Sequence, residues 1–343
     1  PLCPIPLEPH EAVALGYLVS EGNLCHPHGA YFYSTQEDEL RDFIEAAQKF
    51  SNTKITIDRS KPAASVYVGT EKRGVPNGLF TWIKTLGLHG KRATQKHVPD
   101  VVFSANNFSV ARFLGKLWQG DGCISIINYQ AFYATSSRRL ADDVQHLLLR
   151  FGIVSTIHTK SFRYRGGRKT GWTIVVSGVE NLLCFQGHVG RHLIGKKQAA
   201  LQQLVQKCAV RTNNRGRGTS DTIPTTILST VRYEMAVVGL SVKAVAVATG
   251  LSERVFGADS RKRGYTRPII AAIGSALESE VLLGHAQSDI FWDEVVSIKQ
   301  DGREMTYDLS VPGPENFIAD NFFVHNSHEA SSGLVAYQTA YMK

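Results

Sequence analysis

The spacing of hydrophobic positions predicts two successive segments with the same order of elements. In each, an apolar helix precedes two strands, an amphipathic helix, two further strands and a closing helix, because apolar residues recur at helical or at alternating spacing. The first segment contains the predicted elements Glu11–Ser20, Tyr31–Thr35, Leu40–Ala47, Ile55–Ile57, Val66–Val68 and Leu79–Leu86. The second contains Ser109–Gly120, Ile124–Thr135, Leu140–Leu148, Val154–Thr159, Trp172–Val176 and Val179–His188. We therefore expect an α+β fold of two pseudo-symmetric αββαββα subdomains, each with an antiparallel sheet.

An internal repeat supports this division. At one constant offset, Glu21-Gly22 aligns with Asp121-Gly122, and F-Y-S-T at residues 32–35 aligns with F-Y-A-T at residues 132–135. Leu40 and Leu140 follow the same offset without a gap. A repeat of this kind indicates two copies of one structural unit.

The charge distribution indicates a polyanion as a binding partner. The formal net charge is +8, and residues 138–217 carry 15 Lys/Arg against 3 Asp/Glu. Such a concentration favours a nucleic acid, because each neutralised phosphate releases condensed counterions; a solvated basic surface is the alternative. The five scattered cysteines favour a reducing, cytoplasmic setting. No apolar run is long enough to cross a bilayer, so we expect no membrane partner.

Each opening helix closes on an acid followed by glycine, in A-L-G-Y-L-V-S-E-G (14–22) and F-L-G-K-L-W-Q-G-D-G (113–122). A carboxylate is disfavoured at the negative end of the helix dipole. Glu21 and Asp121 at matching positions therefore indicate a divalent cation, with Mg²⁺ expected, since hard cations prefer carboxylate oxygens. Metal at two phosphodiesters would cut both strands of DNA. The alternative is that both acids belong to ordinary helix-end turns.

These motifs, within residues 7–204, resemble the LAGLIDADG homing endonucleases. The resemblance implies a monomeric endonuclease in which the two motif helices pack side by side and the sheets form a saddle over the major groove of double-stranded DNA. It implies that Glu21 and Asp121 bind the metal. It also implies that Gly16, Ser20 and Gly120 are the small residues at the helix contact.

Lysines are the auxiliary catalytic groups that the resemblance implies. Lys96, in K-H-V-P-D, matches the family's pattern before the second motif, and Lys196 or Lys197, in I-G-K-K-Q, is the counterpart. A lysine can orient water or offset charge in the transition state, although most lysines in a basic protein have no such role. Lys116 departs from the pattern, because it stands where the family prefers glycine and Gly115 comes one place early. Either the packing differs there or the second motif is degenerate.

A basic stretch, K-S-F-R-Y-R-G-G-R-K at residues 160–169, has the pattern of a hairpin with interleaved aromatic residues. Arginines along a strand can reach base edges or phosphates, whereas an exposed hairpin with no ligand is the alternative. The candidate DNA-binding residues are Lys160, Arg163, Arg165, Arg168 and Lys169.

Beyond a polar linker at residues 211–220, the stretch 240–256 resembles a helix-turn-helix, and basic residues follow at 261–267. An ordinary helical hairpin is the alternative for this region.

The segment 292–327 resembles the C-terminal blocks of inteins, with Y-D-L-S-V, N-F-I-A and a closing H-N-S. The resemblance implies the C-terminal β segment of a Hint domain and the chemistry of protein splicing. In that chemistry Asn326 cyclises with assistance from His325. Ser327 is the acceptor nucleophile, and Asp308 assists.

The N-terminal splicing blocks of an intein have no match here, so we expect a fragment that requires an N-terminal intein and extein piece as its partner. Residues 327–343 resemble a stretch of the bacterial DNA polymerase III alpha subunit, which would be the host extein. The expected DNA target is then the intein-less polymerase gene.

The expected function is therefore a site-specific double-strand homing endonuclease, dependent on a divalent metal, combined with an autocatalytic splicing segment. The alternatives are a non-catalytic DNA-binding regulator with a degenerate LAGLIDADG fold and a helix-turn-helix, and a free-standing homing endonuclease. The expected domains are two LAGLIDADG subdomains (1–95 and 96–205), a linker with the helix-turn-helix-like region (206–285), the Hint segment (286–326) and the extein (327–343).

Overall fold

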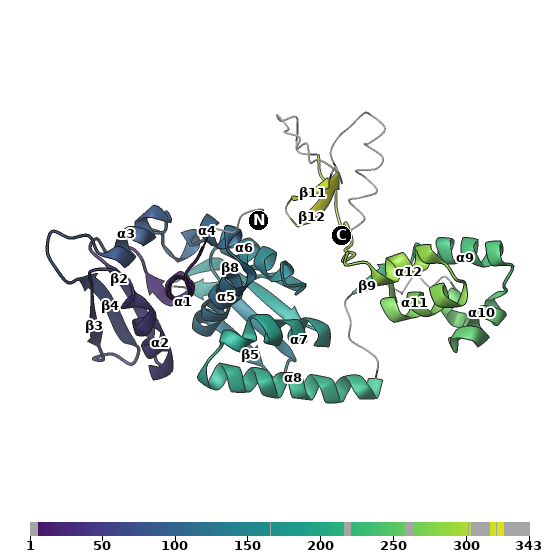
Figure 1. Ribbon diagram of the computed structural model, residues 1–343, viewed down its shortest axis with the longest axis horizontal. Coiled ribbons are helices and arrows are strands. Elements are labelled where there is room, and N and C mark those ends of the chain that lie inside the picture. Colours follow the sequence, from purple (N-terminus) through teal and green to yellow (C-terminus); the bar gives the residue numbers. More distant parts are fainter. Residues whose placement is uncertain are drawn as a thin grey trace. The chain divides into compact units, whose positions relative to one another are not determined.

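The chain divides into two compact units, residues 1–218 and 219–343, each with its own hydrophobic core. Figure 1 shows the computed structural model, coloured from purple at the N-terminus to yellow at the C-terminus. The structure describes residues 6–164, 166–215, 221–257, 264–300, 302, 316–319 and 321–325. The finer division into five segments stays a prediction.

The first unit repeats the order αββαββα, which confirms the order predicted from the hydrophobic pattern. Its first half consists of α1 (Pro9–Glu21), β1 (Gly22–Asn23), β2 (Ala30–Ser34), α2 (Glu37–Ala47), β3 (Thr53–Asp58), β4 (Ala64–Thr70) and α3 (Gly78–Thr85). Its second half consists of α5 (Asn107–Asp121), β5 (Gly122–Ser125), β6 (Gln130–Thr135), α6 (Arg138–Leu149), β7 (Ser155–Tyr164), β8 (Gly167–Ser177) and α7 (Val179–His188).

The two halves have the same sheet topology. The strand orders are β1-β2-β4-β3 and β5-β6-β8-β7, and neighbouring strands are antiparallel. Ser34 pairs with Ala64 in the first sheet, and Ala134 pairs with Thr173 in the second. In Figure 1 the two sheets flank the pair of helices α1 and α5. Equivalent positions of the two halves can therefore be compared residue by residue.

Helices α1 and α5 form the centre of the first unit, and a single core extends across both halves. Residues 12–20 of α1 are all buried, so this helix is packed against other elements around its whole circumference. The amide of Glu8 donates a hydrogen bond to the Glu11 carboxylate (2.9 Å) in a capping box at the start of α1. Asn106 caps α5 by accepting a hydrogen bond from the Ser109 amide (2.9 Å).

The elements between the two halves and after the second half were not predicted from the sequence. Between the halves lie η1 (Ala93–Gln95) and α4 (Asp100–Ser104), and after α7 come η2 (Gly190–His192) and α8 (Gly195–Arg215). Helix α8 continues through residues 211–215, where we expected a linker. Its buried Leu201, Leu204, Val205 and Cys208 follow helical spacing and hold it against the core.

The second unit contains α9 (Ile227–Val238), α10 (Val242–Thr249), η3 (Glu253–Phe256), α11 (Arg267–Ala276) and α12 (Glu280–Gln287). Strands β9 (Thr222–Pro224) and β10 (Gly264–Thr266) pair beside them. The second helix of the expected helix-turn-helix is only the short 3₁₀ turn η3. Arg267 forms an ion pair with Asp221 (2.6 Å) and donates hydrogen bonds to the carbonyls of His285 and Ala286 at the end of α12. Its guanidinium group therefore stabilises the fold.

The described residues near the C-terminus include one hairpin, formed by β11 (Asn316–Ala319) and β12 (Phe322–His325). A Hint domain is not shown. Among the described residues, no helix is long and apolar enough to cross a membrane.

Candidate functional site

The C-terminal ends of α1 and α5 bring Glu21 and Asp121 together. Close packing just before the acids makes this possible, because a β-carbon at Gly120 would lie 2.1 Å from the Oγ of Ser20. The Ser20 hydroxyl turns back to donate a hydrogen bond to the Gly16 carbonyl (3.0 Å). The acids follow directly on each helix, and their carboxyl groups share a hydrogen bond.

The acidity of Asp121 reflects this crowding. Burial raises the pKa of Asp121 from 3.8 to about 7, and the hydrogen bond and charge of Glu21 act in the same direction. Lys96 and Lys197 lower that pKa and only partly offset the rise. Near neutral pH Asp121 is therefore protonated for part of the time, as expected for an acid in a partly buried place beside another carboxyl group.

Lys96 is buried and closes the C-terminal end of α1. Its ammonium group donates hydrogen bonds to the carbonyls of Leu18 (3.2 Å), Ser20 (2.7 Å) and Gly22 (2.9 Å). The Leu18 carbonyl also accepts a hydrogen bond from the Gly22 amide, whereas the carbonyls at the very end of a helix need partners from outside it. A cation is favoured here, at the negative end of the helix dipole. Burial lowers the pKa of Lys96 to about 8, although the nearby acids oppose that shift.

Lys197 repeats this arrangement at the end of α5. It donates hydrogen bonds to the carbonyls of Trp118 (3.3 Å), Gln119 and Gly120 (2.9 Å). Burial lowers the pKa of Lys197. Lys196 is exposed and lines a cavity of about 400 Å³ beside Glu21. The geometry thus distinguishes two lysines between which the sequence left the choice open.

All three N–H donors of Lys96 and of Lys197 are directed at backbone carbonyls. An ammonium group has three donors and no acceptor. In this arrangement the two lysines act on the acids through their charge, and neither has a donor left for a water or a substrate. Their position supports the expected offset of charge and argues against the orientation of water.

Lys116 is accommodated by an ion pair that the sequence did not predict. The side chain is buried, and its ammonium nitrogen lies 2.7 Å from Oδ2 of Asp42 on α2. The same carboxylate accepts a hydrogen bond from the hydroxyl of Tyr17 (2.8 Å). Burial and the charge of Asp42 raise the pKa of Tyr17. A partner from α2 thus accommodates the lysine at this helix crossing.

A second polar link joins α5 to the first half. The buried Gln119 donates to the carboxylate of Glu39 (2.7 Å), and its own carbonyl accepts from the amide of Ile194 (3.0 Å). Glu39 also accepts a hydrogen bond from the hydroxyl of Ser34. The only sequence signal was a polar residue in the otherwise apolar run before Asp121.

The basic hairpin β7–β8 presents its side chains on two different faces. Phe162 pairs with Lys169, and Arg163 pairs with Arg168, so the two pairs point in opposite directions. Lys160, two residues before Phe162, belongs to the face with Phe162 and Lys169. Arg163 and Arg168 belong to the face that α6 covers further along the sheet, where Ile157 pairs with the buried Ile174. Arg165 lies outside the described residues.

The open face of the first sheet carries aromatic residues that the sequence analysis missed. The rings of Tyr31 and Tyr67 lie 4.7 Å apart between centroids, and Tyr31 stacks on Tyr33 at 6.0 Å. His26 contacts both Tyr31 (5.4 Å) and Tyr67 (5.1 Å). The alternation in A-Y-F-Y-S, with Phe32 buried and its neighbours half-buried, was the available signal. The two open faces thus differ, aromatic in one half and basic in the other.

The residues expected to carry splicing are not brought into a site by the described part of the chain. Asp308, Asn326 and Ser327 lie outside the described residues. His325 ends β12, and its backbone position pairs with Asn316.

Comparison with known proteins bears on these arrangements. Residues 109–190 match the family model of the LAGLIDADG-like domain. This match covers α5 and the second sheet, the half that contains Asp121 and Lys116.

Over most of its length the chain is similar to larger proteins. It is 33% identical over 340 residues to the replicative DNA helicase DnaB of Rhodothermus marinus, a match that covers 95% of this chain and 35% of the helicase. It is 30% identical over 332 residues to the DnaB of a Synechocystis strain, covering 94% of this chain and 37% of that protein. The chain thus spans little more than a third of the length of these relatives. Protein RecA of Mycobacterium bovis is more distant, at 25% identity over 352 residues, with 94% of this chain and 42% of RecA covered.

Solved structures with a similar arrangement are remote. Variants of the homing endonuclease I-DmoI align with a TM-score of 0.40 and 15% identity, over 57% of this chain and 97% of theirs. Full-length DUF199/WhiA from Thermatoga maritima aligns with a TM-score of 0.39 and 12% identity, over 82% of this chain and 91% of its own. Likenesses at this level carry no argument about activity.

The relatives correct the interpretation of the C-terminal segment. Over about 95% of the chain the similar proteins named above are replicative helicases and a RecA, and none of them is described as an intein or as a polymerase III subunit. The prediction of a splicing element with a homing endonuclease in a polymerase host is therefore wrong, and so are the expected Hint segment, the extein and the intein partner. The findings agree better with the alternative, a DNA-binding protein built on a LAGLIDADG-like fold.

Proposed function

We propose that the first unit binds double-stranded DNA across the open faces of its two sheets. The observation that carries this proposal is the exposed Lys160, Phe162 and Lys169 on the uncovered face of the β7–β8 hairpin. The surrounding residues 138–217 carry 15 basic against 3 acidic side chains. Positive charge on an open antiparallel ribbon suits a groove lined by phosphates, since most protein–DNA hydrogen bonds go to the backbone.

The two faces of the hairpin provide the test. Lys160→Ala with Lys169→Ala removes two charges from the open face, whereas Arg163→Ala with Arg168→Ala removes the same charge from the opposite face. The affinity of the full chain for a labelled random duplex is measured by fluorescence anisotropy over a series of salt concentrations. Each lost phosphate contact should reduce the slope of log K against log [salt] by about 0.9.

We expect the double lysine variant to reduce the slope by the amount expected for about two lost phosphate contacts. The double arginine variant should leave the slope nearly unchanged. Equal effects of both pairs would show only a general charge effect. An unchanged slope in the lysine variant would exclude this face as the DNA surface.

A second candidate function rests on the paired acids. Within the described residues no group of three or more His, Cys, Asp or Glu side chains could hold a metal ion. The carboxyl groups of Glu21 and Asp121 nevertheless lie within hydrogen-bonding distance of each other at the ends of two helices, and the pKa of Asp121 is raised to about 7. A site in which one of two adjacent carboxyl groups takes up a proton can accept a cation in place of that proton. Two carboxylates suit Mg²⁺, which usually keeps waters and substrate phosphates as its other ligands.

In this second candidate function, a bound divalent cation would polarise a phosphodiester and lower the pKa of a water molecule. The chain's own contribution is to hold the two carboxylates within hydrogen-bonding distance at the ends of two rigid helices. Lys96 and Lys197 place positive charge near Asp121, which lowers its pKa and favours its ionised form.

The test separates metal binding from cleavage. Titration of Mg²⁺ into the full chain by calorimetry should give binding that Glu21→Gln and Asp121→Asn each abolish. Incubation with a plasmid library of random inserts then reports cleavage. Metal binding without cleavage would exclude the nuclease function and keep only the DNA-binding function. Metal binding that survives in both variants would show that these acids do not hold the metal.

A further inference from the structure

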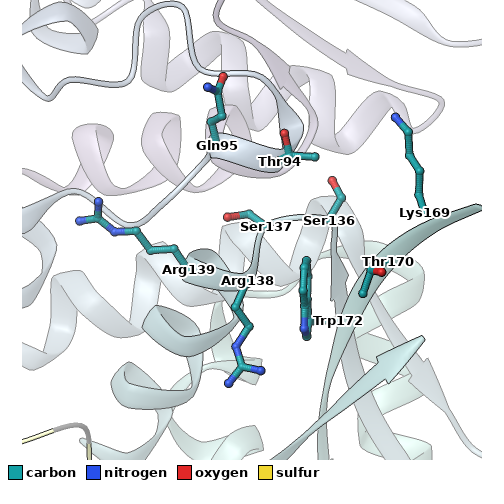
Figure 2. Close-up of a pocket in the computed structure, with 9 residues that line it drawn as sticks. All are labelled: Thr94, Gln95, Ser136, Ser137, Arg138, Arg139, Lys169, Thr170 and Trp172. Carbon is teal, nitrogen blue, oxygen red and sulfur yellow. The ribbon is translucent and has the colours of Figure 1, made fainter. Parts of the chain in front are cut away.

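A cavity of about 590 Å³ lies at the N-terminal end of α6, away from the paired acids. Figure 2 shows its lining residues, which come from three separate segments. Thr94 and Gln95 belong to the turn before Lys96, residues 136–139 span the cap and first residues of α6, and residues 169, 170 and 172 belong to β8. Its volume falls in the range of small-molecule pockets.

The lining is basic and rich in hydroxyl groups. The nine lining residues, all in the described part of the chain, include Arg138, Arg139 and Lys169 and no acid. Arg138 pairs with Asp142 through its Nε (2.8 Å), and within the described part of the chain its two terminal nitrogens make no other hydrogen bond. The twelve-residue helix α6 also directs the positive end of its dipole here. These features together favour an anion.

The other half of the repeat contains an equivalent cavity with a different chemistry. The cavity of about 400 Å³ beside Glu21 is lined by the start of α2 and by Lys196 and Lys197. At the constant offset of the repeat, Asp38 and Glu39 of that cavity correspond to Arg138 and Arg139. One fold thus contains two copies of the same hollow, with carboxylates in one and guanidinium groups in the other.

The strand register extends this comparison to an aromatic wall. Ser34 pairs with Ala64, and its equivalent Ala134 pairs with Thr173. The preceding residues, Ala63 and Trp172, are therefore equivalent, and each lines its own cavity. Where the acidic cavity has a methyl group, the basic cavity has a half-buried indole.

We propose that the basic cavity binds a nucleotide, with its phosphate at Arg138 and Arg139 and its base against Trp172. Guanidinium groups suit phosphate because their donors match its oxygens in a bidentate arrangement. An indole suits any base because every base offers a π face. The ligand can be a free mononucleotide or an unpaired nucleotide of a DNA strand. The proposal does not depend on duplex binding. The cavity shares only Lys169 with the proposed duplex-binding face, and its lining includes neither Glu21 nor Asp121.

The test uses the full chain without duplex DNA. Calorimetric titrations with dAMP, with deoxyadenosine and with inorganic phosphate separate the parts of the ligand. Arg138→Ala with Arg139→Ala should weaken dAMP binding about tenfold or more, since charge-assisted hydrogen bonds are lost. The matched control is Arg59→Ala with Arg73→Ala, which removes two exposed guanidinium groups, one of them also ion-paired, from the first half. That control should change the affinity less than about twofold.

Trp172→Leu should weaken dAMP binding about fivefold or more and leave phosphate binding unchanged, because only stacking is lost. Trp172→Phe keeps a ring and should retain most of the affinity, and thermal melting checks that each variant folds. A short 5′-phosphorylated single strand that competes with dAMP and binds more tightly would assign the cavity to a DNA strand, whereas tighter dAMP would assign it to a free nucleotide. Absence of binding by the unaltered chain to both, or equal losses in the control pair, would overturn the proposal.

Discussion

Gly16 of α1 lies directly against Lys116 of α5. A β-carbon at Gly16 would stand 2.7 Å from the β-carbon of Lys116, 2.7 Å from the carbonyl oxygen of Phe113 and 2.9 Å from the amide of Leu117. Two of these three neighbours are backbone atoms, which cannot turn away. The helices therefore cross closely because α1 contributes the glycine, and α5 can contribute a long side chain at the same place.

We predict that Gly16→Ala destabilises the protein by about 1–3 kcal/mol, because overpacking at a tight crossing forces the helices apart. Gly187→Ala is the matched control, since a β-carbon at this exposed helical position meets nothing within 4 Å. That substitution should add about 0.5–1 kcal/mol by helix propensity. Urea unfolding measures both changes. A Gly16→Ala variant as stable as the Gly187→Ala variant would contradict the close approach of α1 and α5 at Gly16.

Lys116 provides the second prediction. Lys116→Ala removes the ion pair with Asp42 and the packing of the aliphatic stem, and we expect a loss of about 1–3 kcal/mol. Lys116→Met keeps most of the stem and should lose less, because Asp42 is still partly exposed and keeps the hydrogen bond from Tyr17. Equilibrium unfolding distinguishes the two. Equal losses would assign the whole effect to charge and none to packing.

The sequence was sufficient to predict the repeated order of helices and strands. Both halves bury apolar positions at regular spacing, and that spacing is a local property of the chain. The placement of Glu21 and Asp121 was predictable for the same reason, since both end equivalent helices. The repeat offset could not show which face of the β7–β8 hairpin is open. Lys160 and Arg163 point to opposite faces, and only the observed strand pairing and the position of α6 show which face is covered.

The accommodation of Lys116 depends on two residues distant in sequence. Gly16 provides the space and Asp42 provides the charge, and neither stands near position 116 in the chain. The choice between Lys196 and Lys197 also depends on tertiary geometry, because adjacent residues of a helix point about a quarter turn apart. Sequence spacing alone cannot measure either relation.

The linker and the helix-turn-helix show the limits of local composition. The polar stretch after residue 210 contains no breaker until Gly216, so α8 continues to Arg215. Gly250 ends α10 in a left-handed conformation as expected for a turn. Ser252 then caps a 3₁₀ turn in place of a second helix.

The helix-capping lysines provide the third prediction. Lys96→Met and Lys197→Met each leave helix-end carbonyls without a donor, and we expect each to lose about 2–4 kcal/mol of stability. Lys196→Met is the matched control, because this neighbouring lysine is exposed, and it should change stability by less than about 0.5 kcal/mol. Thermal and urea unfolding of the three variants provide the measurement. If Lys196→Met lost as much stability as Lys197→Met, Lys197 would not be the lysine that caps α5.

The fourth prediction follows from the raised pKa of Asp121. Its folded-state pKa of about 7 lies above the value of 3.8 expected in an unfolded chain. Between these values the folded protein binds more protons than the unfolded one, so the contribution of Asp121 to the free energy of unfolding falls as pH rises through that window. Asp121→Asn removes this titration. The difference in Tm, wild type minus Asp121→Asn, should therefore decrease steadily from about pH 4 to about pH 7 and become flat above it.

Asp58→Asn is the control of opposite sign. Hydrogen bonds from Ser60 lower the pKa of Asp58, so its contribution to stability is present above pH 4 or so and is lost only as pH falls further. The difference in Tm between wild type and Asp58→Asn should therefore stay constant from about pH 4 to about pH 7, where the difference for Asp121→Asn declines. Addition of Mg²⁺ at pH 8 should stabilise the unaltered chain more than at pH 6, because protons and the cation compete for the same carboxylates. A Tm difference for Asp121→Asn that does not vary between pH 4 and 7 would show that the pKa of Asp121 is not raised in the folded protein.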